Sequence, residues 1–283
     1  MVAPVAPSPK PQIRPGPRAA IAARTLRQDR WWVSPAISFS VLSSFIIYAT
    51  WAAFVNGNYF VRPYLSPLYS PCVASSCGGD SSQKIHGAAH VPHLGIFGPW
   101  WIISPAIIIL IVPLGFRLTC YYYRRAYYRA FWLSPPACAV GEPHKKYSGE
   151  TRFPLIMQNI HRYFFYLGLL LNLVLTWDAI ESFIDARSAT LGGGHVGLGS
   201  FVLLMNAVLL WSYSLSCHSC RHIVGGRLKH FSRHPIRFKF WGVVSKLNSR
   251  HMQIAWASLV WVALTDLYVR LAASGTLGHG RWI

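Results

Sequence analysis

Thiol and imidazole side chains recur at the predicted ends of long apolar segments, all on one side of a membrane. Cys120 follows one apolar segment, and Cys217 and Cys220 follow another in the stretch SLSCHSCRH. His161 and His251 each open a further apolar segment. If a helix continues through Cys217 and Cys220, their i, i+3 spacing puts both thiols on one face. The sequence therefore predicts a redox metal centre at this level, although a buried cysteine can also act as a small hydrophobe. The candidate ligands are Cys120, His161, Cys217, Cys220 and His251.

Three kinds of metal centre could use these ligands. Two histidines facing each other across a helix bundle can bind haem b, but haem needs no thiol and leaves the cysteines unexplained. A zinc ion bound by two cysteines and two histidines would be purely structural. Two thiolates and two imidazoles can instead bind a Rieske-type [2Fe-2S] cluster, in which histidine ligation of one iron raises the reduction potential. We favour this cluster, with haem b as the alternative. Cys120, Cys217 and Cys220 compete for two positions, and His222 could replace a helix-start histidine.

Five apolar segments must position these residues. The chain of 283 residues is 53% hydrophobic and only 12% charged, whereas an ordinary soluble domain is about 25% charged. Each segment has about the 20 residues needed to cross roughly 30 Å of hydrocarbon. We therefore expect an all-α, polytopic membrane protein with a five-transmembrane-helix bundle. The predicted helices cover about 35–55, 99–119, 161–178, 198–216 and 252–272.

The basic residues are distributed unevenly among the predicted loops. The chain has 27 Lys+Arg against 8 Asp+Glu. The segments before the first helix, between the second and third, and between the fourth and fifth carry 20 of these basic residues, against 5 on the other side. The positive-inside rule then places the N-terminus in the cytoplasm of a multi-pass plasma-membrane protein. We expect a disordered basic cytoplasmic tail over 1–30 and a membrane domain over 31–283. Long apolar runs exclude a nucleic-acid-binding protein.

The opposite side carries its own cysteines and acids. Cys72 and Cys77 lie in a predicted outer loop, where a short disulfide is the default and a metal site with nearby histidines is the alternative. Asp178 and Asp266 fall near the outer ends of two helices and could serve a proton pathway. Alternatively, Asp266 pairs with Arg270 one turn further along the helix.

Four blocks of the sequence resemble the membrane-anchor (cytochrome b-like) subunit of actinobacterial succinate dehydrogenases of the mycobacterial type, part of respiratory complex II. The resemblance implies a five-helix anchor that binds a flavoprotein subunit and an iron–sulfur subunit and delivers electrons to menaquinone. Many anchors of the wider group carry b haems on transmembrane histidines. No histidine lies within the first two predicted helices here, which favours the cysteine-containing cluster. The blocks are RLTCYYYRRAYYRAFW (117–132), SPPACAVGEPHKKYSGETRFPLIMQNIHRYFFYLG (134–168), LSCHSCRH (215–222) and SKLNSRHMQ (245–253).

The resemblance also indicates where a quinone would be reduced. Such a subunit does not act on succinate itself but contributes the quinone site, which belongs at the cytoplasmic membrane face. Because quinone reduction consumes two protons, hydrogen-bonding groups should line the site. The alternative for each candidate is an ordinary interfacial role, in an aromatic belt or beside lipid phosphates. The candidates are Tyr122, Arg124, Trp132, Arg162 and His218.

Two other functions stay open at this point, a transporter and a cofactor-free structural anchor. A transporter would show internal repeats and helices interrupted near the membrane midplane, but the two halves show no repeat and the polar residues gather at one face. The basic cytoplasmic surface could bind partner subunits or anionic lipid. The eight basic residues between the fourth and fifth helices predict that a partner covers part of that loop. A higher oligomer is compatible with the sequence.

Overall fold

Long apolar helices make up most of the described chain. The computed structural model describes residues 27–55, 57–71, 104–141, 143, 153–188, 196–226 and 228–277. Within these residues, four helices are long and apolar enough to cross a membrane, or five spans result if a bent helix pair counts as one. The prediction of a mostly helical chain with long apolar helices is therefore confirmed, whereas the number of five spans stays a prediction. The four helices are α1 (Val33–Val55), α5 (Phe153–Ser188), α6 (Leu198–Leu215) and α9 (His251–Ala273).

The bent pair occupies the place of the second predicted span. It runs from α2 (Pro105–Ile109) and α3 (Ile111–Leu118) into α4 (Tyr121–Tyr127) and a π-helical turn, Tyr128–Trp132. The helical segments on the two sides of the break meet at 84°. Thr119 and Cys120 lie in that break, so the chain turns sharply where a predicted ligand stands.

Helix lengths depart from the predicted segments at both ends of α5 and at the end of α6. Helix α5 has 36 residues and is longer than the predicted 161–178 segment. After Pro154 it contains no proline, so nothing interrupts the helix on either side of that segment. Helix α6 ends at Leu215, and Cys217 becomes the N-cap residue of the short helix α7 (His218–Gly225). Helix α6 therefore does not continue through Cys217 and Cys220, so the i, i+3 alignment that a continuous helix would give the two thiols does not arise from it.

The chain divides into two compact units. One unit comprises 1–39 and 126–149, and the other comprises 40–125 and 150–283. In the first unit, the Phe39 and Phe131 rings pack with centroids 4.9 Å apart. The Arg27 guanidinium donates a 2.7 Å hydrogen bond to the Cys138 carbonyl and pairs with Asp29.

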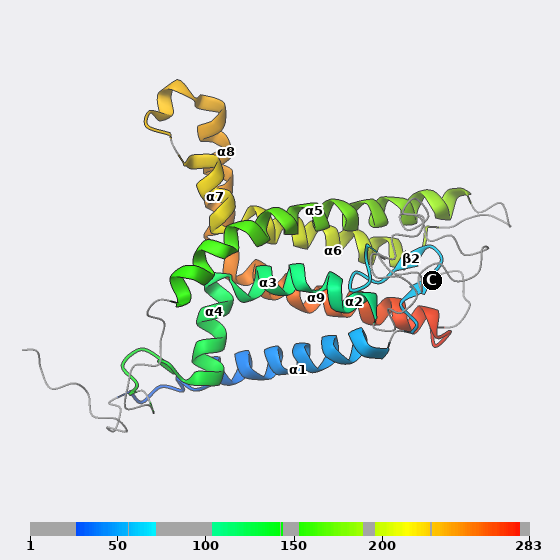
Figure 1. Ribbon diagram of the computed structural model, residues 1–283, viewed down its shortest axis with the longest axis horizontal. Coiled ribbons are helices and arrows are strands. Elements are labelled where there is room, and N and C mark those ends of the chain that lie inside the picture. The colour runs from blue at the N-terminus through cyan, green and yellow to red at the C-terminus, as the bar shows by residue number, and fades with distance from the viewer. Residues whose placement is uncertain are drawn as a thin grey trace, which may run out of the picture. The chain divides into compact units, whose positions relative to one another are not determined.

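In the second unit, α5, α6 and α9 lie side by side, and α3 packs along α5 (Figure 1). Helices α7 and α8 (Pro235–Asn248) form a hairpin near one end of these helices. The Arg237 side chain fastens this hairpin by donating hydrogen bonds to the Val224 and Gly226 carbonyls, at 2.5 and 2.9 Å. Pro235 at the first turn of α8 suits a helix start, where no backbone N–H is needed.

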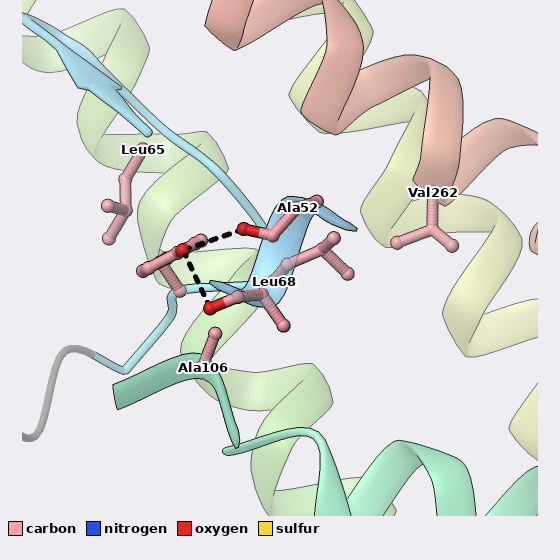
Figure 2. Close-up of a cluster of buried hydrophobic side chains, with 7 residues drawn as sticks. Ala52, Leu65, Leu68, Ala106 and Val262 are labelled. Carbon is pink, nitrogen blue, oxygen red and sulfur yellow. Dashed lines mark hydrogen bonds between the residues drawn. The ribbon is translucent and has the colours of Figure 1, made fainter. Parts of the chain in front are cut away.

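A small strand pair closes the opposite end of the same unit. Strand β1 (Phe60–Val61) pairs antiparallel with β2 (Tyr64–Leu65). The chain that follows packs on the end of α1, where the Tyr69 hydroxyl donates a 2.8 Å hydrogen bond to the Ala52 carbonyl. Figure 2 shows Ala52, Leu65, Leu68, Ala106 and Val262 converging in this buried cluster.

A buried ion pair ties α9 to the same end. The Arg270 guanidinium lies 2.8 Å from the Asp266 carboxylate, and both side chains are buried. Arg270 also donates to the Ala52 and Gly57 carbonyls at the end of α1, each at 2.8 Å. The alternative of an Asp266–Arg270 pair is thus the arrangement found. On α5, the Asp178 carboxylate accepts a hydrogen bond from the Ser70 hydroxyl.

Candidate functional site

Four buried thiol and imidazole side chains come together where α3, α5, α6 and α9 meet. Cys120 follows α3, His161 lies in the third turn of α5, Cys217 follows α6, and His251 is the first residue of α9. Their exposed fractions are 2%, 7%, 1% and 2%. Segments far apart in the sequence thus bring four of the five predicted ligands into one buried place.

Each imidazole in this place contacts one thiol. The Nε2 atom of His161 lies 3.0 Å from Sγ of Cys217. The Nε2 atom of His251 lies 3.4 Å from Sγ of Cys120. Each contact joins a histidine on one helix to a cysteine just beyond the end of another helix, so it fixes the relative positions of those helices as well as of the side chains.

The other nitrogen of each imidazole meets a hydroxyl group. The Nδ1 atom of His161 is 2.8 Å from the Thr119 hydroxyl, and Nδ1 of His251 is 2.7 Å from the Ser216 hydroxyl. Every ring nitrogen of the two histidines therefore has a polar neighbour. Buried polar groups without partners are costly, so this arrangement explains how two histidines are tolerated here.

Aromatic rings cover both imidazoles. Phe116 stacks on His161 with centroids 5.0 Å apart and an interplanar angle of 17°. Tyr213 stacks on His251 at 5.1 Å and 10°. The Arg117 guanidinium lies 4.8 Å from the Tyr213 ring centroid, and it also donates to the Ser258 hydroxyl on α9 at 3.2 Å. These contacts exclude water from the site.

The remaining candidate ligands lie elsewhere. Cys220 is buried on α7, but among the described residues it makes no hydrogen bond to the two thiol–imidazole pairs. His222 is exposed on α7. Three cysteines were candidates for two ligand positions. Of these, Cys120 and Cys217 are the two whose Sγ atoms contact an imidazole nitrogen.

The predicted quinone-binding residues differ in their burial and neighbours. The Tyr122 ring packs against His251 with centroids 5.2 Å apart, whereas Arg124 is buried on α4. Arg162 and His218 are exposed. Trp132 belongs to the other compact unit, where its ring packs on Tyr128. Tyr122 thus contacts one of the four thiol and imidazole side chains, and Arg124 and His218 lie close enough to His161 to interact with it electrostatically.

The geometry can be compared with known proteins. The sequence matches the family described as actinobacterial succinate dehydrogenase subunit SdhC over residues 33–275. This chain belongs to that family. It is also similar to a chain of the structure "Mycobacterium smegmatis Sdh1 complex in the apo form", with 52% identity, a TM-score of 0.77 and coverage of 92% of this chain and 95% of that chain. Among curated proteins no match is found. The resemblance seen in the sequence is confirmed, and the chain is a membrane subunit of a succinate dehydrogenase complex.

The described residues of this SdhC family member do not form a single-ion metal site. Within the residues that the structure describes, no group of three or more His, Cys, Asp or Glu side chains could hold one metal ion. A zinc ion of the tetrahedral type needs four ligands around one point, so that alternative has no support. The predicted redox centre stays a prediction.

Burial sets the protonation of the thiol that lies beyond the end of α6. The low-polarity surroundings raise the pKa of Cys217 to about 12, and the neighbouring Cys120 thiol adds to this effect. Cys217 is therefore a neutral thiol at physiological pH and can donate its S–H to Nε2 of His161. A metal would have to displace this proton, because thiolate is the ligand form.

Sequence reasoning missed an apolar cavity beside the site. The cavity has a volume of about 400 Å³ and lies among α1, α3, α5 and α6. Phe116 and Tyr213, the two rings stacked on the imidazoles, both line it, together with Arg117, Asn172 and Ser214. The other lining residues are mostly apolar types that also face lipid, so the sequence held no signal that separates the two environments.

Proposed function

We propose that this membrane subunit passes electrons from the flavoprotein and iron–sulfur subunits of its complex through the buried Cys–His site to menaquinone. The observation that carries the proposal is the convergence of Cys120, His161, Cys217 and His251 from four helical segments. Burying two thiols and two imidazoles costs free energy that a purely structural helix bundle has no need to spend. A water-soluble chain of redox centres and a lipid-soluble acceptor need a relay placed between them.

The donor set fits a Rieske-type [2Fe-2S] cluster in number and type. Such a cluster takes only two protein ligands per iron, so it does not require three side chains around one ion. Cys120 and Cys217 would hold one iron, and His161 and His251 the other. When bound, the cluster supplies one-electron transfer. The protein residues bury the site, exclude water with Phe116 and hold the imidazoles in place.

Haem b has less support as the alternative cofactor. Axial ligation of haem by two histidines requires their donor nitrogens to face each other across the porphyrin plane. In the structure the Nε2 atoms of His161 and His251 each face a sulfur atom instead, and both Nδ1 atoms meet hydroxyl groups.

The α7–α8 hairpin is the proposed contact surface for the soluble subunits, on the cytoplasmic side with the N-terminus. Ile236, Phe240 and Val243 are exposed on α8, and Lys239 and Lys246 are exposed on the same helix. Exposed apolar side chains among cations suit a protein partner, since the apolar groups add buried area and the cations add complementarity.

The 400 Å³ cavity is the proposed place for the isoprenoid chain of the quinone. Its volume and apolar lining with a few polar groups are typical of small-molecule sites. Phe116 and Tyr213 separate it from the imidazoles by one ring each. Tyr122 is the proposed hydrogen-bonding residue for the quinone ring, because its ring packs on His251.

A double variant, His161→Ala with His251→Ala, tests the proposal in the purified complex. We expect it to lose the iron and acid-labile sulfide of one cluster and to lose quinone reduction, while reduction of a water-soluble acceptor by succinate continues. His222→Ala is the matched control for iron and sulfide content, because His222 is exposed on α7 and lies outside the four-residue site. Unchanged iron and sulfide in the double variant would remove the cluster from this site.

A cofactor-free structural anchor is the second candidate function. The observation that favours it is that the four groups already satisfy one another as two thiol–imidazole contacts. This function predicts that the same double variant loses stability but no iron. The transporter alternative has no support from the family.

A further inference from the structure

Two pentapeptides at the site repeat one pattern. Residues 116–120 read FRLTC and residues 213–217 read YSLSC. In each, the helix ends at the leucine, at Leu118 in α3 and at Leu215 in α6. The next residue, Thr119 or Ser216, is the C-cap, with φ and ψ of −84° and −10° or −77° and −7°. Sequence and backbone therefore repeat together.

The two pentapeptides contact the imidazoles in a crossed manner. The aromatic residue and the hydroxyl of FRLTC both contact His161, through its ring face and its Nδ1 atom. The cysteine of the same pentapeptide contacts His251 instead. YSLSC does the converse, with its ring and hydroxyl on His251 and its cysteine on His161. Each pentapeptide thus positions one imidazole and offers its thiol to the other.

The hydroxyl contacts determine which ring nitrogen carries the proton. The Thr119 hydroxyl donates to the Gly115 carbonyl at 2.7 Å, and the Ser216 hydroxyl donates to the Tyr213 carbonyl at 2.9 Å. A hydroxyl has one proton to donate, and a carbonyl oxygen can only accept. If that proton went to the imidazole, the hydroxyl and carbonyl oxygens would face each other without a hydrogen between them. Both hydroxyls therefore accept from Nδ1–H, and Nε2 of each neutral ring is left as the lone-pair atom.

We propose that Thr119 and Ser216 are positioning residues that hold His161 and His251 as Nδ1–H tautomers and so make Nε2 the metal-binding atom of both rings. The metal part rests on the proposed function, whereas the tautomers do not. A partner on the second nitrogen orients a ligating histidine and strengthens it as a donor, and its loss usually weakens metal binding 10–100-fold.

The chain offers matched variants for the test. Thr119→Val and Ser216→Ala remove the hydroxyls, while Thr119→Ser and Ser216→Thr keep them. Thr265→Val and Ser182→Ala are controls, because Thr265 and Ser182 are buried and their hydroxyls donate to carbonyls of their own helices. No imidazole contacts either control hydroxyl in the described part of the chain.

The experiment uses the complex purified with ¹⁵N-labelled histidine. Iron retention is followed against a chelator series, and nitrogen couplings to the reduced site are followed by pulsed EPR. We expect Thr119→Val and Ser216→Ala each to lower metal affinity 10–100-fold and to change the coupling of one imidazole. The conservative variants and both controls should match wild type. Wild-type affinity and couplings in Thr119→Val and Ser216→Ala would overturn the proposal.

A second measurement separates the tautomers from the metal. The ¹⁵N NMR shifts of the same labelled complex distinguish Nδ1–H from Nε2–H rings without any metal. We expect two Nδ1–H signals that disappear one at a time in Thr119→Val and Ser216→Ala. If both Nδ1–H signals are lost as expected but the wild-type site contains no iron, the metal assignment is overturned and the tautomer assignment stands. If the signals are Nε2–H in wild type, the tautomer assignment is overturned.

Discussion

Cys120, Cys217 and Cys220 differ in their neighbours although all three are buried cysteines. Cys120 and Cys217 each lie against an imidazole nitrogen, whereas Cys220 lies in the first turn of α7. Residue type and spacing alone made the three equivalent in the sequence. The distinction arises because α6 ends at Leu215, which turns Cys217 inward and starts a new helix direction before Cys220.

We predict that variants of the two cysteines that contact an imidazole lose the cluster, whereas a variant of Cys220 retains it. Cys120→Ser and Cys217→Ser should each lose the iron and acid-labile sulfide of one cluster from the purified complex, because each removes a proposed ligand. Cys220→Ser should retain both and is the matched control. Loss of iron and sulfide in Cys220→Ser with retention in Cys120→Ser would contradict the ligand assignment.

At the scale of elements, close packing of α3 on α5 holds the Thr119–His161 contact in place. Gly115 on α3 faces Phe164 on α5, and a Cβ atom built at Gly115 would lie only 2.2 Å from the Phe164 ring. A side chain at this position must therefore displace the Phe164 ring or push the two helices apart. The contact depends on an approach that only glycine permits.

Gly115→Ala should accordingly lower the stability of the membrane subunit by about 1–3 kcal/mol, as overpacking usually does, and weaken iron binding at the site. Thermal unfolding of the purified complex, with iron assayed in parallel, measures both effects. Gly242→Ala is the control, since a Cβ at Gly242 on α8 meets nothing within 4 Å. Equal stability of the two variants would show that the α3–α5 approach is not tight.

The helices were predicted best where a long apolar run alone defines their position in the sequence. Helices α1, α6 and α9 follow from long apolar runs, and His251 was expected at a helix start, which is where α9 begins. The 84° bend at Thr119–Cys120 was not foreseen, because neither Thr119 nor Cys120 is a helix breaker by type. The FRLTC and YSLSC pair was not predicted either. A comparison of the two halves of the chain does not detect a repeat of five residues, and the role of these residues depends on contacts with two distant histidines.

At the scale of the whole molecule, the net charge of +19 concerns binding to partners more than folding. Exposed Lys239 and Lys246 lie on α8, in the hairpin proposed to contact the soluble subunits. Electrostatic contacts at such a surface weaken with salt, so charge reversal there should affect assembly at low salt most.

The variant Lys239→Glu with Lys246→Glu should reduce the fraction of membrane subunit that copurifies with the flavoprotein and iron–sulfur subunits. Arg62→Glu is the comparison, because Arg62 is exposed between the two short strands at the other end of the helices. Gel filtration at low and moderate salt reads out the fraction assembled. Equal losses in both variants would argue against the hairpin as the contact surface.

Electron paramagnetic resonance of the reduced, purified complex tests the relay most directly. We predict a signal of low average g-value, typical of a [2Fe-2S] cluster with histidine ligands, in the wild type and in His222→Ala, and its absence in the His161→Ala, His251→Ala double variant. A wild-type complex that reduces quinone without any such signal, or a signal that survives the double variant unchanged, would contradict electron transfer through this site.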